Sequence, residues 1–225
     1  MPSRPYPCGV LERLAIRSYY DRIGRGQDTQ RFYEDPPTGR LRECAQFVTA
    51  TSVVELGCGT GRFARTLLRE QLPVAANYHG FELSGRMAAI AASRLRPWAG
   101  RVAVARIDGD PPLPLGDARA DRFIANYVLD LMTPDDARRW LDEAHRVLEP
   151  AGLLCLVSIT PGTGRASRVV TDTWTRVWRR RPSLVGGCRP IELLDLLDQD
   201  QWKTLNREIL TAWSVSSEVV VARRR

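Results

Sequence analysis

The sequence has no long apolar run, and this excludes the simplest membrane-spanning architecture. Its longest apolar stretches, such as Leu153 to Val157, are far shorter than the roughly 20 residues that a helix needs to cross a bilayer. The first 26 residues also lack the continuous apolar core, about 7–15 residues long, of a secretory signal. We therefore expect a cytoplasmic protein with no membrane partner.

Histidine is scarce and the cysteines form no metal-binding pattern. The chain has two histidines and five cysteines, an odd number that contains no C-x-x-C pair. A structural zinc site is difficult to build from this set, so we expect no metal and free thiols in a reducing compartment. The cysteines are Cys8, Cys44, Cys58, Cys155 and Cys188.

Lysine is almost absent, because Lys203 is the only lysine among 33 basic residues. The formal charge of +7 is therefore carried by arginine, and so extreme a bias is more typical of genome-wide composition than of a phosphate-binding surface. The arginine clusters at 179–181 and 223–225 are not interleaved with base-stacking aromatic residues. Solvated arginines are the favoured interpretation, and a polyanion site is the alternative.

What is present is typical of one folded domain, or of one domain with a small cap. The 225 residues are 44% hydrophobic and 26% charged, which excludes a disordered or fibrous chain. From residue 52 onward, short apolar runs alternate with helical patterns, and this alternation predicts a parallel sheet with right-handed crossovers. Strands are expected at 52–56, 76–83, 101–107, 122–128 and 153–159, and helices at 62–70, 84–95 and 133–148.

The two ends of the chain depart from this alternation. Strands at 203–213 and 217–222, joined by a turn at 214–216, predict an antiparallel hairpin that makes the sheet mixed, after a helix at 191–197. At the N-terminus, helical patches at 10–20 and 41–50 flank a predicted loop at 24–39 that contains Pro36-Pro37. We divide the chain into an N-terminal helical cap, residues 1–50, and a core, residues 51–225, in which 160–187 forms a lid insert.

The sharpest local feature is the glycine-rich turn after the first strand, Glu55-Leu56-Gly57-Cys58-Gly59-Thr60-Gly61. Glycines allow positive φ and close approach of a ligand, and the helix that follows offers unpaired N–H groups. A nicotinamide dinucleotide site needs a third glycine where this chain has Arg62. Glu55 is also awkward beside a pyrophosphate, but it suits a ligand that bears an ammonium group.

This segment resembles motif I of the class I S-adenosylmethionine-dependent methyltransferases, and the resemblance extends from about residue 52 to 159. It implies a doubly wound, Rossmann-like α/β fold with a mixed seven-stranded sheet, a C-terminal antiparallel hairpin and a helical N-terminal and insert cap. It also implies S-adenosyl-L-methionine as the cofactor. The residues that it assigns to cofactor binding are Glu55, Gly57, Cys58, Gly59, Gly61, Glu82, Leu83, Asp108, Gly109 and Asn126.

Two acids in this set end neighbouring strands. Glu82 ends the second strand, and an acid beside a glycine-rich turn is expected to bind a ribose in any nucleotide fold. By resemblance, Asp108 ends the third strand and accepts a hydrogen bond from the adenine amino group. Asp110 lies close enough in sequence to compete for this role, and we favour Asp108.

The sequence fixes no catalytic residue. Tyr127 and Asp130 follow the fourth strand at the switch point of the predicted sheet, and Tyr20 lies in an N-terminal Tyr-Asp element that often packs near the methionine part in small-molecule methyltransferases. Each is a weak candidate for a general base. Trp174 and Trp178 fall on one face of a helix in the insert, where helix packing is favoured over an acceptor pocket. The arginines at 165, 168 and 176 could bind an acidic acceptor, with solvation favoured.

We therefore predict a methyltransferase that acts on an oxygen, nitrogen or carbon atom of a small molecule. The alternatives are an NAD(P)-dependent oxidoreductase, an RNA-directed enzyme and a cofactor-binding domain without turnover. Arg62, Glu55 and the terminal hairpin argue against the oxidoreductase.

Overall fold

The computed structural model describes residues 10–225, so Cys8 lies outside the described residues. The strands are β1 (Ser52–Leu56), β2 (Asn77–Glu82), β3 (Val102–Arg106), β4 (Ala120–Asn126), β5 (Leu148–Ile159), β6 (Trp202–Ala212) and β7 (Val215–Arg224). The α-helices are α1 (Arg13–Ile23), α2 (Arg31–Cys44), α3 (Arg62–Glu70), α4 (Gly85–Leu95), α5 (Pro134–Val147) and α6 (Arg165–Arg180). No helix within 10–225 combines the length and apolarity needed to span a membrane.

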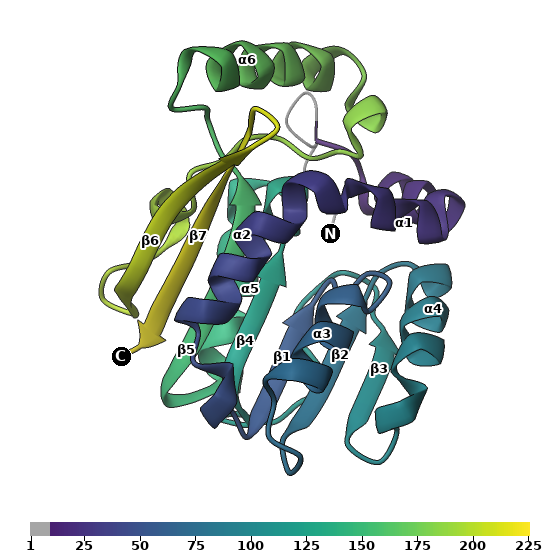
Figure 1. The fold of residues 1–225 in the computed structure, drawn as a ribbon, viewed down its shortest axis with the longest axis vertical. Helices are drawn as coiled ribbons and strands as arrows, with labels where there is room; N and C mark the ends of the chain where they lie inside the picture. Colours follow the sequence, from purple (N-terminus) through teal and green to yellow (C-terminus); the bar gives the residue numbers. More distant parts are fainter. Residues whose placement is uncertain (1–9) are drawn as a thin grey trace, which may run out of the picture.

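The seven strands form one mixed sheet in the order β3-β2-β1-β4-β5-β7-β6 (Figure 1). Strands β1 to β5 are parallel to one another, and β7 runs antiparallel to both β5 and β6. The predicted sheet and its terminal hairpin are confirmed. The hairpin turn is shorter than expected: it consists of Trp213 and Ser214 alone, both at positive φ.

Alternate side chains of each central strand enter two cores on opposite faces of the sheet. Val53 packs with α2 and α3, whereas Val54 packs with α5. This alternation is what a period of two requires of a strand that is covered on both faces. The strand order reverses between β1 and β4, so the connections that leave the carboxyl ends of these two strands run in opposite directions and leave room for a ligand. Helices α1 and α6 lie beyond this edge of the sheet (Figure 1).

The predicted loop at 24–39 is wrong. A 3-10 helix (Gly24–Gln30) leads into α2, which contains Pro36 and Pro37. Each proline removes one helical hydrogen bond. However, α2 buries a face that includes Leu41 against the sheet, and the Thr38 hydroxyl donates to the Glu34 carbonyl at 2.7 Å. Packing therefore decides the conformation of this segment where local sequence suggested a break.

The predicted helix at 191–197 is also mostly absent, because only Leu193–Leu196 forms a 3-10 turn. The backbone before it is fixed to the sheet: the Ile191 N–H donates to the Ile159 carbonyl at 2.9 Å, and the Leu193 N–H donates to the Glu218 carboxylate at 2.6 Å. The boundary between cap and core at residue 50 stays a prediction. Leu41, Ala45, Phe47 and Ala50 are buried in the core of the sheet.

Candidate functional site

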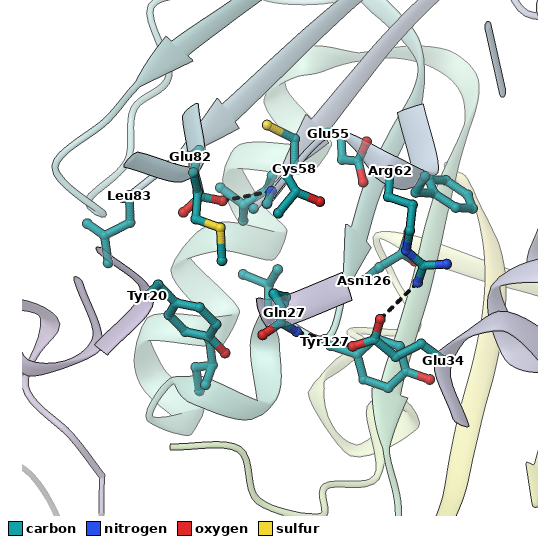
Figure 2. Close-up of a pocket in the computed structure, with 18 of the residues that line it drawn as sticks. Tyr20, Gln27, Glu34, Glu55, Cys58, Arg62, Glu82, Leu83, Asn126 and Tyr127 are labelled. Carbon is teal, nitrogen blue, oxygen red and sulfur yellow. Dashed lines mark hydrogen bonds and ion pairs between the residues drawn. The ribbon is translucent and has the colours of Figure 1, made fainter. Parts of the chain in front are cut away.

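A cavity of about 420 Å³ lies at the carboxyl ends of β1, β2 and β4. The sheet contributes one wall, and segments of α1, the following 3-10 helix and α2 contribute the facing wall (Figure 2). Eight of the ten predicted cofactor residues line the cavity, and the other two, Gly61 and Asp108, are described below. The eight are Glu55, Gly57, Cys58, Gly59, Glu82, Leu83, Gly109 and Asn126.

The glycine-rich turn brings the backbone to the wall of the cavity. Gly57 has φ +67°, and a Cβ placed on it would come within 2.4 Å of a methyl group of Val128. The Gly57 N–H donates to the Phe81 carbonyl at 2.7 Å, which ties the turn to β2. Gly61, at φ +72°, packs against Ala91 of α4 and is absent from the cavity lining. Gly57 therefore lets the turn form the wall of the cavity close to Val128, while Gly61 allows α3 and α4 to approach each other.

Glu82 is buried at the end of β2 and points toward the turn. Its carboxylate accepts a hydrogen bond from the Gly59 N–H at 2.9 Å (Figure 2) and another from the Ser84 N–H at 2.9 Å. Burial raises the pKa of Glu82, and these two N–H groups oppose the rise. A carboxylate has about four lone-pair sites, so acceptor capacity remains for two hydroxyl groups of a ligand.

Glu55 lies at the base of the cavity and is 2% exposed. The Tyr78 hydroxyl donates to its carboxylate at 2.6 Å. Burial raises the pKa of Glu55 to about 7, against the lowering effect of this hydrogen bond, and the charge of Glu82 adds to the rise. A ligand with a positive charge near Glu55 would restore the carboxylate to its ionised form.

The end of β4 presents the least satisfied polar group of the cavity. Both the oxygen and the nitrogen of the Asn126 side-chain amide are buried without a hydrogen-bond partner. Buried polar atoms in folded proteins are nearly always paired. Because Asn126 lines the cavity, its unpaired amide is expected to meet a ligand there.

The candidate bases differ in their access to the cavity. Tyr127 and Tyr20 line it, and burial raises the pKa of each hydroxyl well above its usual value, so neither is a ready proton acceptor. Asp130 is fully buried and absent from the lining. Burial raises its pKa to about 7, and one carboxylate oxygen accepts the Ile159 N–H at 3.4 Å.

The structure does not bring the Asp108 carboxylate into the cavity. Its side chain is 91% exposed and pairs with Arg106 at 2.9 Å, so the adenine contact of Asp108 stays a prediction. Asp110 pairs with Arg13 and Arg139. At this point the cavity is lined by Gly109, beside Leu83, and by Ile107.

Sequence reasoning missed the residues of the facing wall. Glu34 is 9% exposed and accepts from Arg62 at 3.0 Å and from the Gln27 amide at 3.2 Å (Figure 2). Tyr33 packs edge-on against Tyr127, with ring centroids 5.9 Å apart. These residues were overlooked because they fall in the segment interpreted as a loop. The helical spacing of Tyr33, Pro37 and Leu41 was the available signal.

The insert does not line the cavity with its aromatic pair. Trp174 and Trp178 donate their indole N–H groups to the carbonyls of Cys188 and Gly187, at 2.8 and 3.0 Å. Packing against the sheet, the favoured interpretation, holds for Trp174, which packs with Ile159 and Val215, whereas Trp178 bonds to the segment before Cys188. Cys188, which these bonds hold, does line the cavity, whereas the arginines at 165, 168 and 176 are exposed and do not.

Comparison with known proteins agrees with this geometry. Residues 53–152 match the family described as "Methyltransferase domain". A curated relative, malonyl-[acyl-carrier protein] O-methyltransferase from Dechloromonas aromatica, is 28% identical over 152 residues, which is 67% of this chain. The chain spans about half of that relative's length, since the match covers 53% of it.

Solved structures share the fold at low sequence identity. The N-methyltransferase NodS from Bradyrhizobium japonicum, in complex with S-adenosyl-L-homocysteine, superposes with a TM-score of 0.72 at 15% identity, over 93% of this chain and 98% of that one. A possible histamine N-methyltransferase from Thermotoga maritima gives 0.69 at 20% identity, over 92% and 99%. The [4+2]-cyclase SpnF gives 0.65 at 20% identity, over 84% and 81%.

The family match runs from β1 to the start of β5, and the strand order and the glycine-rich turn agree with it. The cavity lies where a nucleotide ligand of a doubly wound sheet is expected. Residues 53–152 therefore match a methyltransferase domain, and the chain has the fold of the methyltransferase structures named above.

Proposed function

We propose that this protein transfers a methyl group from S-adenosyl-L-methionine to a small-molecule acceptor. The observation that carries the proposal is the convergence of the glycine-rich turn, the buried Glu82 and the unpaired Asn126 amide on one cavity. The cavity volume, about 420 Å³, is in the usual range for small-molecule sites.

The residues present fit the cofactor. Glu82 keeps acceptor capacity for the two ribose hydroxyls. Gly57 forms part of the cavity wall at a point where an added side chain would collide with Val128. Glu55 and the Asn126 amide are suited to the ammonium end of the methionine part. Leu83, Ile107 and Gly109 line the part of the cavity that we assign to the adenine ring, and Asp108 is the proposed partner of the adenine amino group.

The cofactor supplies a methyl group that its positive sulfur already activates, so the main task of the chain is to position the two reactants. Good alignment of reacting groups lowers a barrier by roughly 7–11 kcal/mol in favourable systems. Residues of α1 and α2 line the cavity opposite the sheet, and a wall that limits the access of water strengthens electrostatic contacts at a reacting centre. Relatives carry both O- and N-methyltransferase names, so they leave the acceptor atom open.

The alternative functions predict different ligands. An NAD(P)-dependent oxidoreductase would need a third glycine, for close packing of helix against strand, where this chain has Arg62. Arg62 here begins α3 and pairs with Glu34. An RNA-directed enzyme would use the exposed arginines of α6, and its binding would weaken steeply with salt. If the protein does not bind RNA, or if its binding does not depend on salt, the RNA-directed alternative is contradicted.

Two measurements test the proposal. Calorimetry should show that S-adenosylmethionine binds and that NAD(P) does not. Incubation with cofactor labelled in the methyl group and a host metabolite extract should then yield a small molecule with one added labelled methyl. Affinity for NAD(P) without affinity for S-adenosylmethionine would reverse the assignment, and binding without any labelled product would indicate a domain without turnover.

A further inference from the structure

The end of the cavity away from Glu82 is lined by aromatic rings and a buried acid. Tyr20, Tyr33 and Tyr127 contribute the rings, and Glu34 contributes the acid. Figure 2 shows Gln27 between Tyr20 and Glu34, with Tyr127 beside them. Aromatic faces combined with a carboxylate are the arrangement that proteins use to hold organic ammonium groups.

Acids outnumber arginines at this end, three to two among the groups that act on one another. Glu34 faces Arg62, Asp35, Tyr33, Tyr127 and Cys188, and among these only Arg62 is a cation. Behind the tyrosines, the second buried acid, Asp130, acts on Tyr20, Tyr33 and Tyr127, with Arg189 as its opposing charge. Both arginines already have partners within the protein. Arg62 pairs with Glu34 and Asp35, and Arg189 donates to the Met132 carbonyl at 2.8 Å.

The Gln27 side chain leaves an unpaired acceptor at this end. Its amide donates through its nitrogen to Gln30 and Glu34, while its oxygen is buried without a partner. This oxygen and the Glu34 carboxylate call for a group that brings N–H donors, because a buried acceptor without a donor costs free energy.

Resting on the methyl transfer proposed above, we infer that the acceptor is a small amine, held by Glu34, Gln27 and the three tyrosines. An oxyanion acceptor, whether carboxylate or phenolate, would face two buried acids and would find no free cation among these groups. These groups therefore favour nitrogen over an oxyanion as the acceptor atom.

Glu34 has a position suited to the proton that the amine must lose. Burial raises the pKa of Glu34 to about 7, against the pull of Arg62, so the carboxylate can take a proton near neutral pH. The ammonium gives one proton to Glu34, and the nitrogen lone pair forms the bond to the methyl carbon. The sulfur–carbon bond breaks with its electron pair on sulfur, and the product leaves as a methylammonium ion while Glu34 returns its proton to water.

Three probes of nearly one shape test the charge preference of the site. Choline, 3,3-dimethyl-1-butanol and 3,3-dimethylbutanoate carry positive, neutral and negative charge, and none can be methylated at its quaternary centre. They are titrated into protein saturated with S-adenosylhomocysteine. Choline should bind roughly tenfold more tightly than the alcohol, with the anion weakest, and Glu34→Gln should remove most of this preference.

Asp35→Asn is the matched control, because Asp35 pairs with the same arginine but its side chain is 52% exposed. This variant should keep the order of the three probes. Equal affinities, tighter binding of the anion, no binding of choline, or the same loss in both variants would overturn the inference.

The labelled-extract experiment separates this inference from the proposed function. A labelled methyl on nitrogen supports both. A labelled methyl on oxygen, carbon or sulfur leaves methyl transfer standing and overturns the amine acceptor. Failure of the protein to bind S-adenosylhomocysteine at all would instead contradict the proposed function.

Discussion

At the scale of single residues, two glycines of the same turn differ in what surrounds them. A Cβ on Gly57 would meet Val128 at 2.4 Å, whereas a Cβ on Gly59 would meet no atom within 4 Å, and both have positive φ. Gly57→Ala should therefore lower the free energy of unfolding by about 2–4 kcal/mol, and Gly59→Ala by only about 1 kcal/mol, since the second carries backbone strain alone. Urea unfolding measures both, and equal losses would contradict the close approach at Gly57.

Glu55 should make the stability of the ligand-free protein depend on pH. Its pKa is about 7 in the folded state and near 4.5 when unfolded, so the folded protein binds the extra proton between these values. The contribution of Glu55 to the free energy of unfolding should accordingly fall as pH rises from about 4.5 to 7. Glu55→Gln keeps an acceptor for Tyr78 but cannot ionise.

The Glu55→Gln variant should thus be more stable than the wild type by up to about 3 kcal/mol at pH 8, with the difference vanishing near pH 4. Unfolding curves of both proteins across this range measure it. Because Glu34 and Asp130 titrate in the same window in both proteins, the difference between the two isolates Glu55. If the free energies of unfolding of the two proteins change with pH in parallel, the folded protein ionises Glu55 without losing stability.

At the scale of elements, Ser84 joins the N-terminal wall of the cavity to the core. Its hydroxyl accepts from the Met87 N–H as the N-cap of α4, and donates to Asp21 of α1 at 2.6 Å. Thr133 caps α5 in the same way, but its hydroxyl donates to Asp136 of its own helix at 2.9 Å. Thr133→Ala and Ser84→Ala should each cost about 2 kcal/mol of stability, because each removes a cap and a charged hydrogen bond, but only Ser84→Ala removes a bond to α1.

Limited proteolysis separates capping from docking. Cleavage within residues 10–30 should accelerate in Ser84→Ala and stay at the wild-type rate in Thr133→Ala. Equal protection in the two variants would mean that α1 is held by its other contacts, such as those of Asp21 with Arg86.

Elements whose signal is local could be predicted, and elements decided by packing could not. The five parallel strands and the N-caps Ser84 and Thr133 follow from hydrophobic period and capping chemistry, and the structure has them. Helix α2 was missed because two prolines outweigh its apolar spacing when its contacts with the sheet are unknown. Part of the facing wall of the cavity was missed with it, since Glu34 and Tyr33 belong to that helix.

At the scale of the whole molecule, the cavity depends on segments far apart in sequence. The cofactor wall comes from β1, β2 and β4, and the facing wall comes from residues before 50 together with Cys188. The glycine-rich turn and Glu82 could be found from sequence because spacing marks them. The meeting of Gln27, Glu34 and Asn126 is a property of the tertiary fold, and no local pattern encodes it.

A ligand that binds only the folded state raises the stability of the whole chain by a calculable amount. At 100 times its Kd, S-adenosylmethionine should stabilise the wild type by about 2.7 kcal/mol, and Tm should rise by roughly 5–10 °C for a domain of this size.

Glu82→Gln loses the charged hydrogen bonds to the ribose and should weaken binding about tenfold or more. At the same cofactor concentration its stabilisation should fall to about 1.4 kcal/mol, with a Tm rise about half as large. Each protein is compared with itself without ligand, because Glu82 also accepts the N–H groups of Gly59 and Ser84. NAD(P) is the control and should move neither Tm. An unchanged cofactor response in Glu82→Gln would show that the carboxylate ending β2 does not hold the ribose.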